Sequence, residues 1–353
     1  MRLQGLIGVS LLLSTACTSL PAPSPESVHT AIPSSESRSQ VPSPTAITPG
    51  TATPDLSEKG TWLERASMPT ARSEMPAVEL NGLIYVPGGF GPEPAGLANG
   101  YGPVNTFDVY NPRTDEWQSL APMPQPRHHL MVTAYQGKIY AFGGFIDPWI
   151  TQSNTWVYDP VTDQWSVLRP MPAPRTAGAA VTLGDSIYLV GGTTSQAGAI
   201  LPTWRYNPAS DTWKDVAALS QPREHNAAVV LNGKIYALGG RWTTNYSSVE
   251  IYDPSSNHWT MGASMQFERA GFGATVMNGR IYVGGGELID VLKTLNSVEV
   301  FDPETGTWSS LPDMPRRLHG VPLIGIGNTL YILGGSGRSA DVINWGRVYA
   351  LHP

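Results

Sequence analysis

The sequence has a single cysteine, Cys17, among its 353 residues. No disulfide can form within the chain, so the fold must be held by its core. Charged residues are scarce as well, at 14%, and the formal net charge is −6. This balance gives no basic surface for nucleic acid, and we expect no nucleic-acid partner. The motifs H-E-x-x-H, G-x-S-x-G and the Walker loop are also missing, which removes common sequence signs of an enzyme.

The N-terminus has the pattern of an export signal. Arg2 supplies a short positive region, and the apolar run 6–13 is too short to span a bilayer as a stable helix. The stretch LSTAC at 13–17 resembles the bacterial lipoprotein signal-peptidase motif, although Ser14 stands where that family usually has leucine. The resemblance implies that Cys17 is lipidated and becomes the new N-terminus. The alternative is an ordinary signal peptide with an unmodified cysteine.

Residues 18–60 are rich in serine, threonine and proline and contain no aromatic residue. Such a segment buries too little apolar surface to offset its ordering entropy, so we predict a disordered tether. With residues 1–17 as the signal peptide, the expected protein is exported and monomeric. It would be attached to the outer side of a cell membrane through its lipid anchor only.

From residue 61 onward the sequence repeats with a period of 46 to 55 residues, which is typical of propeller blades. Six tryptophans each precede a Gly-Gly pair by 26 residues. The tryptophans are Trp62, Trp117, Trp165, Trp213, Trp259 and Trp308, and the first glycines are Gly88, Gly143, Gly191, Gly239, Gly285 and Gly334. An Asn-Pro or Asp-Pro turn, as in DPVTDQW at 159–165, precedes five of these tryptophans. Each unit is therefore predicted to form four strands.

Glycine pairs, a tyrosine or phenylalanine before the turn, and a tryptophan, repeated in this order, resemble the kelch motif. The resemblance covers residues 61–353 and implies an all-β fold, a six-bladed kelch-type β-propeller around a central channel. The last unit stops after GRVYALHP at 346–353, and the domain begins with the strand at Trp62. We predict that this N-terminal strand closes the last blade, a 1+3 latch that removes two free edges.

An arginine lies sixteen residues before five of the glycine pairs, and Leu318 stands at the sixth position. The arginines are Arg72, Arg127, Arg175, Arg223 and Arg269. Because they follow the repeat, we interpret them as structural, each fixing an inter-blade loop by charge-assisted hydrogen bonds.

Positions that break the repeat are better candidates for function, because binding residues gather in loops at a channel mouth. Fourteen residues before the glycine pairs stand Glu74, His129, Ala177, His225, Gly271 and Gly320. The kelch resemblance implies that this position opens towards the mouth. With varied residues after the pairs, the predicted ligand-binding set is Glu74, His129, His225, Arg241, Glu287, Phe90, Phe145, Trp149 and Trp242. Such a mixture suits a carbohydrate or a protein loop.

No cofactor and no metal ion are predicted. Galactose oxidase shares this architecture and uses copper with a tyrosine crosslinked to a cysteine, but no cysteine follows Cys17. His128 and His129 are adjacent, and on a strand their rings would face opposite ways. Ligands from distant blades can converge without leaving a trace in the spacing.

The predicted function is binding, with no catalytic residue: a surface-anchored propeller that recognises an extracellular protein or glycan through one channel mouth. The alternative is an exported sugar mutarotase, because bacterial N-acetylneuraminate epimerases resemble exported six-bladed kelch proteins and need only acid–base groups. Glu74, His129 and His225 would then serve as those groups. A structural spacer without a small ligand is the third interpretation.

Overall fold

The computed structural model describes residues 60–93, 100–146, 149–194, 198–338 and 346–353. The predicted signal peptide at 1–17 lies outside the described residues, as does the predicted tether up to residue 59. Among the described residues there is no helix of the length and apolarity needed to cross a membrane.

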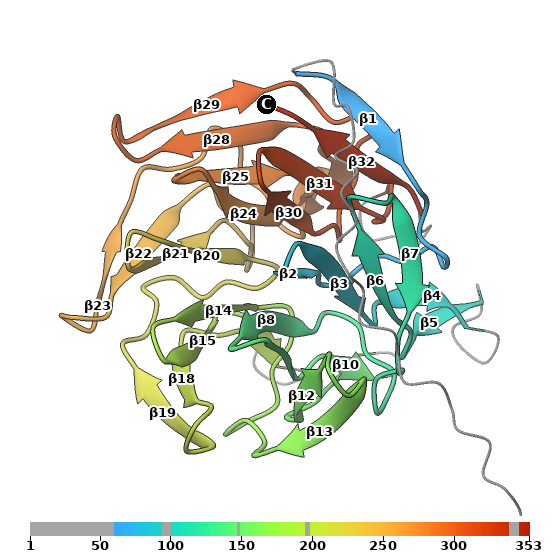
Figure 1. The fold of residues 1–353 in the computed structure, drawn as a ribbon. Helices are drawn as coiled ribbons and strands as arrows, with labels where there is room; N and C mark the ends of the chain where they lie inside the picture. The colour runs from blue at the N-terminus through green and yellow to red at the C-terminus, as the bar shows by residue number, and fades with distance from the viewer. Residues whose placement is uncertain (1–59, 94–99, 147–148, 195–197, 339–345) are drawn as a thin grey trace, which may run out of the picture. The chain divides into compact units, whose positions relative to one another are not determined.

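Six four-stranded antiparallel sheets form the blades of a propeller (Figure 1). Blade 1 contains β2 (Val78–Leu80), β3 (Leu83–Pro87), β6 (Phe107–Asn111) and β7 (Glu116–Ser119). Blade 2 contains β8 (Met131–Tyr135), β9 (Lys138–Phe142), β12 (Thr155–Asp159) and β13 (Gln164–Leu168). Blade 3 contains β14 (Ala179–Leu183), β15 (Ser186–Val190), β18 (Thr203–Asn207) and β19 (Thr212–Val216). Blade 4 contains β20 (Ala227–Leu231), β21 (Lys234–Leu238), β22 (Val249–Asp253) and β23 (His258–Met261). Blade 5 contains β24 (Gly273–Met277), β25 (Arg280–Gly284), β28 (Val298–Asp302) and β29 (Thr307–Leu311). Blade 6 contains β30 (Leu323–Ile326), β31 (Thr329–Leu333), β32 (Val348–Leu351) and β1 (Trp62–Arg65).

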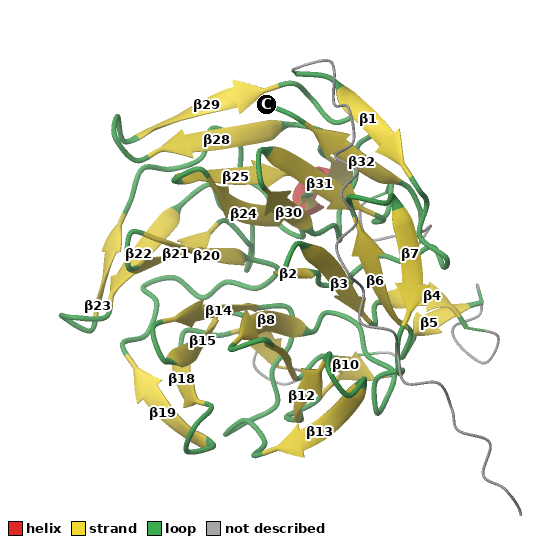
Figure 2. Ribbon diagram, viewed as in Figure 1, coloured by secondary structure: helices red, strands yellow, loops and turns green. Residues whose placement is uncertain are grey.

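Four short hairpins follow glycine pairs, at the end of the blades where the candidate site lies. They are β4 (Phe90–Pro92) with β5 (Tyr101–Pro103), β10 (Phe145–Ile146) with β11 (Ile150–Thr151), β16 (Thr193–Thr194) with β17 (Gly198–Ala199), and β26 (Glu287–Leu288) with β27 (Lys293–Thr294). A single 3₁₀ turn, η1 (Ile289–Val291), connects the last pair. Figure 2 shows that the rest of the described chain is strand and loop. The predicted all-β fold is therefore confirmed.

The blades close into a circle. The innermost strands β2, β8, β14, β20, β24 and β30 each pack against the next, and β30 packs against β2. At the junction, β1 pairs antiparallel with β32, so that Trp62 lies opposite Leu351 and Arg65 opposite Val348. Blade 6 thus takes its outermost strand from the N-terminal end of the domain, which is the closure that the repeat predicts. The sequence and the structure agree on six blades.

Local sequence explains the first hairpin of the blades. In blade 4, for example, Asn232 and Gly233 connect β20 to β21, with φ of 50° and 73°. A two-residue turn with two positive φ angles matches the right-handed twist of the flanking strands, and Asn-Gly is the pair that adopts it best.

The repeated tryptophans fasten each blade to the one before it. The indole N–H of Trp165 in blade 2 donates to the carbonyl of Ala121, in the loop that leaves blade 1, at 3.1 Å. The same bond recurs from Trp62 to Pro312, Trp117 to Ala66, Trp213 to Arg169, Trp259 to Ala217 and Trp308 to Ala263. A buried indole needs a partner for its N–H, so these residues serve the scaffold.

The five repeated arginines are fully buried. A residue on the third strand of each blade interacts with the charged guanidinium group. Ion pairs form between Arg72 and Asp108, Arg223 and Glu250, and Arg269 and Glu299. Arg127 and Arg175 lie instead over the rings of Trp156 and Trp204, at the strand position of those carboxylates. Blade 6 replaces the pair by Leu318 and Tyr349, which share one apolar cluster. These contacts give the arginines the structural role that the repeat predicts.

Candidate functional site

A closed ring of six backbone hydrogen bonds lies at one end of the channel. Its members, one shortly before each innermost strand, are Glu74, His129, Ala177, His225, Gly271 and Gly320. The N–H of each member donates to the carbonyl of the member from the preceding blade, over 2.6–3.0 Å. We call these six residues the backbone ring. It ties all six blades together at the point where their innermost strands begin.

The backbone ring is strained wherever it carries a side chain. All six members have φ between 48° and 62°, and glycine at 271 and 320 adopts this conformation freely. A residue with a Cβ atom costs about 1–2 kcal/mol there, yet Glu74, His129 and His225 are large. Strain of this kind gathers at functional sites. Glycine would meet the backbone requirement at all six positions. The side chains of Glu74, His129 and His225 are therefore not explained by the scaffold.

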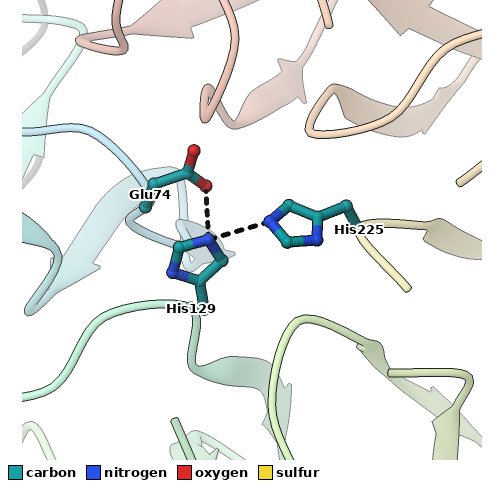
Figure 3. A group of neighbouring side chains, drawn as sticks. All are labelled: Glu74, His129 and His225. Atoms are coloured by element: carbon teal, nitrogen blue, oxygen red, sulfur yellow. Dashed lines mark hydrogen bonds and ion pairs between the residues drawn. The ribbon is translucent and has the colours of Figure 1, made fainter. Parts of the chain in front are cut away.

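The side chains of Glu74, His129 and His225 point toward one another (Figure 3). Oε2 of Glu74 lies 3.0 Å from Nε2 of His129, which lies 2.9 Å from Nε2 of His225. No more than 13% of any of the three side chains is exposed. The three atoms lie within 4.8 Å of one another, an arrangement that could hold a metal ion. The structure thus brings together the three titratable residues that the sequence selected.

Two further residues of blade 4 hold the ring of His225. Nδ1 of His225 lies 3.0 Å from Oε2 of Glu224, whose Oε1 accepts a hydrogen bond from Nε of Arg241 at 2.8 Å. Burial alone would raise the pKa of Glu224, but His225 and Arg241 lower it to about 2. The carboxylate is therefore ionised at neutral pH and orients the imidazole.

The remaining contacts close a circuit of polar side chains. Arg241 also pairs with Glu287, and Nε2 of His319 lies 3.8 Å from Oε2 of Glu287 and 3.2 Å from Oε1 of Glu74. We call the seven residues of this circuit the mouth network: Glu74, His129, Glu224, His225, Arg241, Glu287 and His319. Five blades contribute to it, and three of its members are carboxylates while one is a guanidinium.

Burial and neighbouring charges act against each other in the mouth network. Burial would raise the pKa of Glu74, but His129 and His319 hold it well below its usual value. The pKa of His319 is raised, because Glu74 and Glu287 outweigh its burial. For His129 burial dominates and lowers the pKa. In the contact between Glu74 and His129, the pKa values of both partners are therefore lowered.

Of the predicted aromatic residues, two lie behind the network. Phe90 is only 1% exposed and meets the ring of His128 edge-on at 5.0 Å. Phe145 is 6% exposed and packs against the rings of His128 and His129. Phe90 therefore packs against the ring of His128, and Phe145 packs against the rings of both His128 and His129. Trp149, in contrast, is 53% exposed, with its ring 6.2 Å from that of His129.

Large apolar side chains are exposed in the segments that follow three of the glycine pairs. Trp242, next to Arg241, is 46% exposed and lies against Gly198, where a Cβ atom would overlap its indole ring. We define the apolar rim as Trp149, Ile150, Trp242, Val291 and Leu292, all exposed and all in segments that follow a glycine pair. The rim is a hydrophobic surface at the same end of the blades as the mouth network.

The channel next to the backbone ring contains a cavity of about 320 Å³. The six members of the ring line it together with the innermost strands, whose side chains here are mostly small and apolar, such as Val132, Ala180 and Ala228. This volume lies within the range of small-molecule sites.

Sequence reasoning missed Glu224 and His319, and it misjudged His128. All three stand one position before a member of the backbone ring, and each forms a β-bridge with the residue after its glycine pair. This position varies from blade to blade and could have been selected by the same count. The expectation that the rings of His128 and His129 face opposite ways is wrong: their Nδ1 atoms lie 2.5 Å apart, because φ of 54° at His129 ends the strand alternation.

Comparison with known proteins finds a protein family that matches this chain. Residues 57–192 and 169–335 match the family model described as the KLHDC2/KLHL20/DRC7 Kelch-repeats domain. The chain is similar to Kelch-like ECH-associated protein 1B of Danio rerio, with 36% identity over 85 residues, which are 24% of this chain and 14% of that protein. It is similar to the Influenza virus NS1A-binding protein of Homo sapiens, with 32% identity over 103 residues, 27% of this chain and 15% of that protein. An F-box/kelch-repeat protein of Arabidopsis thaliana is 29% identical over 105 residues, 27% of this chain and 26% of that protein. The chain therefore matches about a quarter or less of the length of each of these relatives.

Proposed function

Because the chain belongs to the Kelch-repeat family, we propose that it is a binding module that recognises a protein partner through its channel mouth. The apolar rim carries this proposal. Trp149 and Trp242 are half exposed beside a polar network, although large aromatic side chains are normally buried. Protein interfaces are enriched in such aromatic anchors, which often supply most of the binding energy. One relative, the Influenza virus NS1A-binding protein, is named for a protein ligand.

A photo-crosslinking amino acid tests the proposal. We would place it at position 149 on the apolar rim and, as a matched control, at Val161, an exposed apolar residue at the outer turn of blade 2. The expected result is a crosslink to one defined protein from position 149 and none from position 161. Equal crosslinking from both positions, or none from position 149, would contradict a partner at the mouth.

A sugar is the second candidate ligand, and the contact between Glu74 and His129 favours it. A carboxylate 3.0 Å from an imidazole is an acid–base pair, and the exposed ring of Trp149 beside it could stack on a sugar face. A thermal-shift screen with free sugars, including sialic acid, and short glycans would detect such a ligand. At 100 times its Kd a ligand adds about 2.7 kcal/mol of stability.

Substitution of Glu74 distinguishes a sugar-binding module from a mutarotase. In a mutarotase, Glu74→Gln would lose turnover, measured by NMR, and keep its affinity for the sugar. In a binding module the variant would lose affinity, because Glu74 would contribute to binding rather than to proton transfer. Absence of any stabilising sugar would remove both readings and leave the protein partner.

We propose further that the chain is exported and lipidated at Cys17, with residues 18–60 as its tether. The argument is the N-terminal sequence, in which a short apolar run precedes a small residue and the only cysteine. Cys17→Ser should abolish fatty-acid labelling and move the protein from the membrane fraction to the soluble one. Retention of the variant in membranes would contradict the lipid anchor.

A further inference from the structure

We propose that Glu74, His129 and His225 bind a divalent transition-metal ion, with Zn²⁺ as the best match. The ligand atoms are Oε2 of Glu74 and Nε2 of each histidine, from blades 1, 2 and 4. Two imidazoles and one carboxylate form a donor set that suits zinc and ferrous iron and leaves coordination positions open. The proposal goes beyond partner binding and does not depend on it.

The spacing of the three atoms suits an ion between them. Metal–ligand bonds of about 2.0–2.1 Å at tetrahedral angles place neighbouring ligand atoms about 3.3 Å apart. The two measured separations are 3.0 Å from Glu74 to His129 and 2.9 Å from His129 to His225, and all three atoms lie within 4.8 Å of one another. Side-chain movements of about 0.3–0.4 Å would bring the two short separations to that ideal.

The hydrogen-bonding roles open to the three ligand atoms also favour a bound cation. Nε2 of His129 faces both Oε2 of Glu74 and Nε2 of His225, but an imidazole nitrogen either donates or accepts. If it donates to Glu74, its single proton cannot also point fully at the lone pair that Nε2 of His225 carries when Nδ1 donates to Glu224. If it accepts from His225, its lone pair faces the lone pairs of the carboxylate. A cation at the centre would satisfy all three atoms at once.

The surroundings of the ligands resemble an outer coordination shell. A metal-binding histidine typically donates its other N–H to a carboxylate, which directs the free nitrogen at the metal. His225 has this arrangement, because its Nδ1 lies 3.0 Å from Oε2 of Glu224, which Arg241 holds in turn. The second oxygen of Glu74 is held by His319 at 3.2 Å. Glu74 and His225 are thus held in place before any ion arrives.

Charge supports the same conclusion. The mouth network contains three largely buried carboxylates, which face the guanidinium of Arg241 and the imidazole of His319. A divalent cation between Glu74 and the two histidines would add attraction to the carboxylate of Glu74. The other members of the backbone ring, Ala177, Gly271 and Gly320, offer no donor side chain. At least one coordination position therefore remains for water or for a ligand that enters through the mouth.

Calorimetry on the full-length chain tests the site. The protein would be purified without a histidine tag, treated with chelator and titrated with Zn²⁺, and with Co²⁺ to record its absorption bands. We expect one ion per chain and no comparable binding of Mg²⁺, which requires mainly oxygen ligands. His225→Gly should lower the Zn²⁺ affinity by more than about 100-fold, beyond the roughly 10–100-fold that loss of an outer-shell partner costs.

Glycine is chosen at position 225 because φ of 50° there suits it, as at Gly271, so the backbone ring should persist. His258→Ala, which changes an exposed histidine on β23, is the matched control and should bind like the parent. Glu224→Gln should weaken binding by about 10–100-fold through the ring of His225. Unchanged Zn²⁺ affinity in His225→Gly or in Glu74→Gln would overturn the proposal. Because no partner is needed, failure of the crosslinking experiment would leave this site standing, and the reverse also holds.

Discussion

The carboxylate of Glu74 lies beside Gly320 in the space that a Cβ atom would need. An ideal Cβ atom on Gly320 would lie 2.7 Å from Oε1 and 2.8 Å from the backbone N of Glu74, both closer than a Cβ atom can approach. Gly271, at the same position of the neighbouring blade, has no such neighbour: the nearest atom to its Cβ position is 3.6 Å away. Glycine at 320 is therefore required by the position of Glu74, while glycine at 271 is required only by its φ angle.

Alanine at these two glycines should separate backbone strain from damage to the site. Their φ angles are nearly equal, 60° at Gly320 and 62° at Gly271, so each substitution costs about 1–2 kcal/mol of strain. Gly320→Ala must also displace Glu74, and we expect a further loss of stability and a Zn²⁺ affinity lowered at least about tenfold. Urea denaturation and calorimetry measure the two effects. Equal Zn²⁺ affinity in both variants would show that the position of Glu74 does not matter.

Ala177 should be replaceable by glycine with a gain in stability. It has φ of 52° in the backbone ring, and its methyl group offers no donor to a ligand. Relief of the strain should add about 0.5–1 kcal/mol to the free energy of unfolding, after the greater entropy of glycine in the unfolded chain is subtracted. Ala179→Gly, in the regular strand β14, should instead lose about 0.5–1 kcal/mol. A loss of the same size in both variants would contradict the strain.

The blades could be predicted from the sequence because their bonds repeat. The indole of Trp165 needs a carbonyl in the preceding blade and bonds that of Ala121, and the other five repeated tryptophans bond the corresponding carbonyls. The closing pair of β1 and β32 followed from counting strands. Local chemistry and a fixed period were sufficient for this part of the molecule.

The site was predictable only in part. Counting from the glycine pairs selected Glu74, His129 and His225, since all three occupy one position of the repeat. It did not reveal that their donor atoms converge, because a positive φ redirects each side chain away from the strand alternation. Glu224 and His319 were missed because the position directly before the ring was not counted. The proposed metal site has no signature in the sequence, because its ligands come from distant blades and show no metal-binding spacing.

Two buried arginines that occupy the same repeat position should lose unequal amounts of stability when replaced by leucine. Arg223 pairs with Glu250 at 2.8 Å, and removing one partner of a buried pair costs about 3–5 kcal/mol. Arg175 forms no ion pair within the described chain, and its Nε and Nη2 atoms have no hydrogen-bond partner there. Its guanidinium lies 3.7 Å from the ring centre of Trp204, a contact of about 2 kcal/mol when desolvated.

We therefore expect Arg223→Leu to lose about 3–5 kcal/mol and Arg175→Leu to remain within about 1 kcal/mol of the parent. In the second variant, release of a buried charge offsets the lost contact with Trp204. Blade 6 already has leucine at this position, Leu318, with Tyr349 beside it. Denaturant unfolding followed by tryptophan fluorescence measures both. A loss above about 3 kcal/mol in Arg175→Leu would show that the stacked arginine is as necessary as the paired one.

The latch between β1 and β32 should open more easily than any other strand pair of the blades when its tryptophan is removed. Trp62 donates its indole N–H to the carbonyl of Pro312 at 3.1 Å and packs against the cluster that contains Tyr349 and Leu351. In blade 5, Trp308 makes the corresponding bond to the carbonyl of Ala263 at 2.9 Å. The strand of Trp308, β29, is joined to its neighbour β28 by a short turn. No such turn joins β1 to β32, so β1 depends on side-chain packing to stay in place.

Trp62→Ala should consequently raise amide hydrogen exchange at 62–65 and 348–351 at least about tenfold, with smaller changes elsewhere. Trp308→Ala should lower global stability by about 3–5 kcal/mol, as expected for a buried tryptophan, without local opening of blade 6. Hydrogen exchange followed by mass spectrometry distinguishes the two patterns. Uniform acceleration in both variants would mean that the propeller opens as one unit, because the latch would then be as stable as the covalently connected blades.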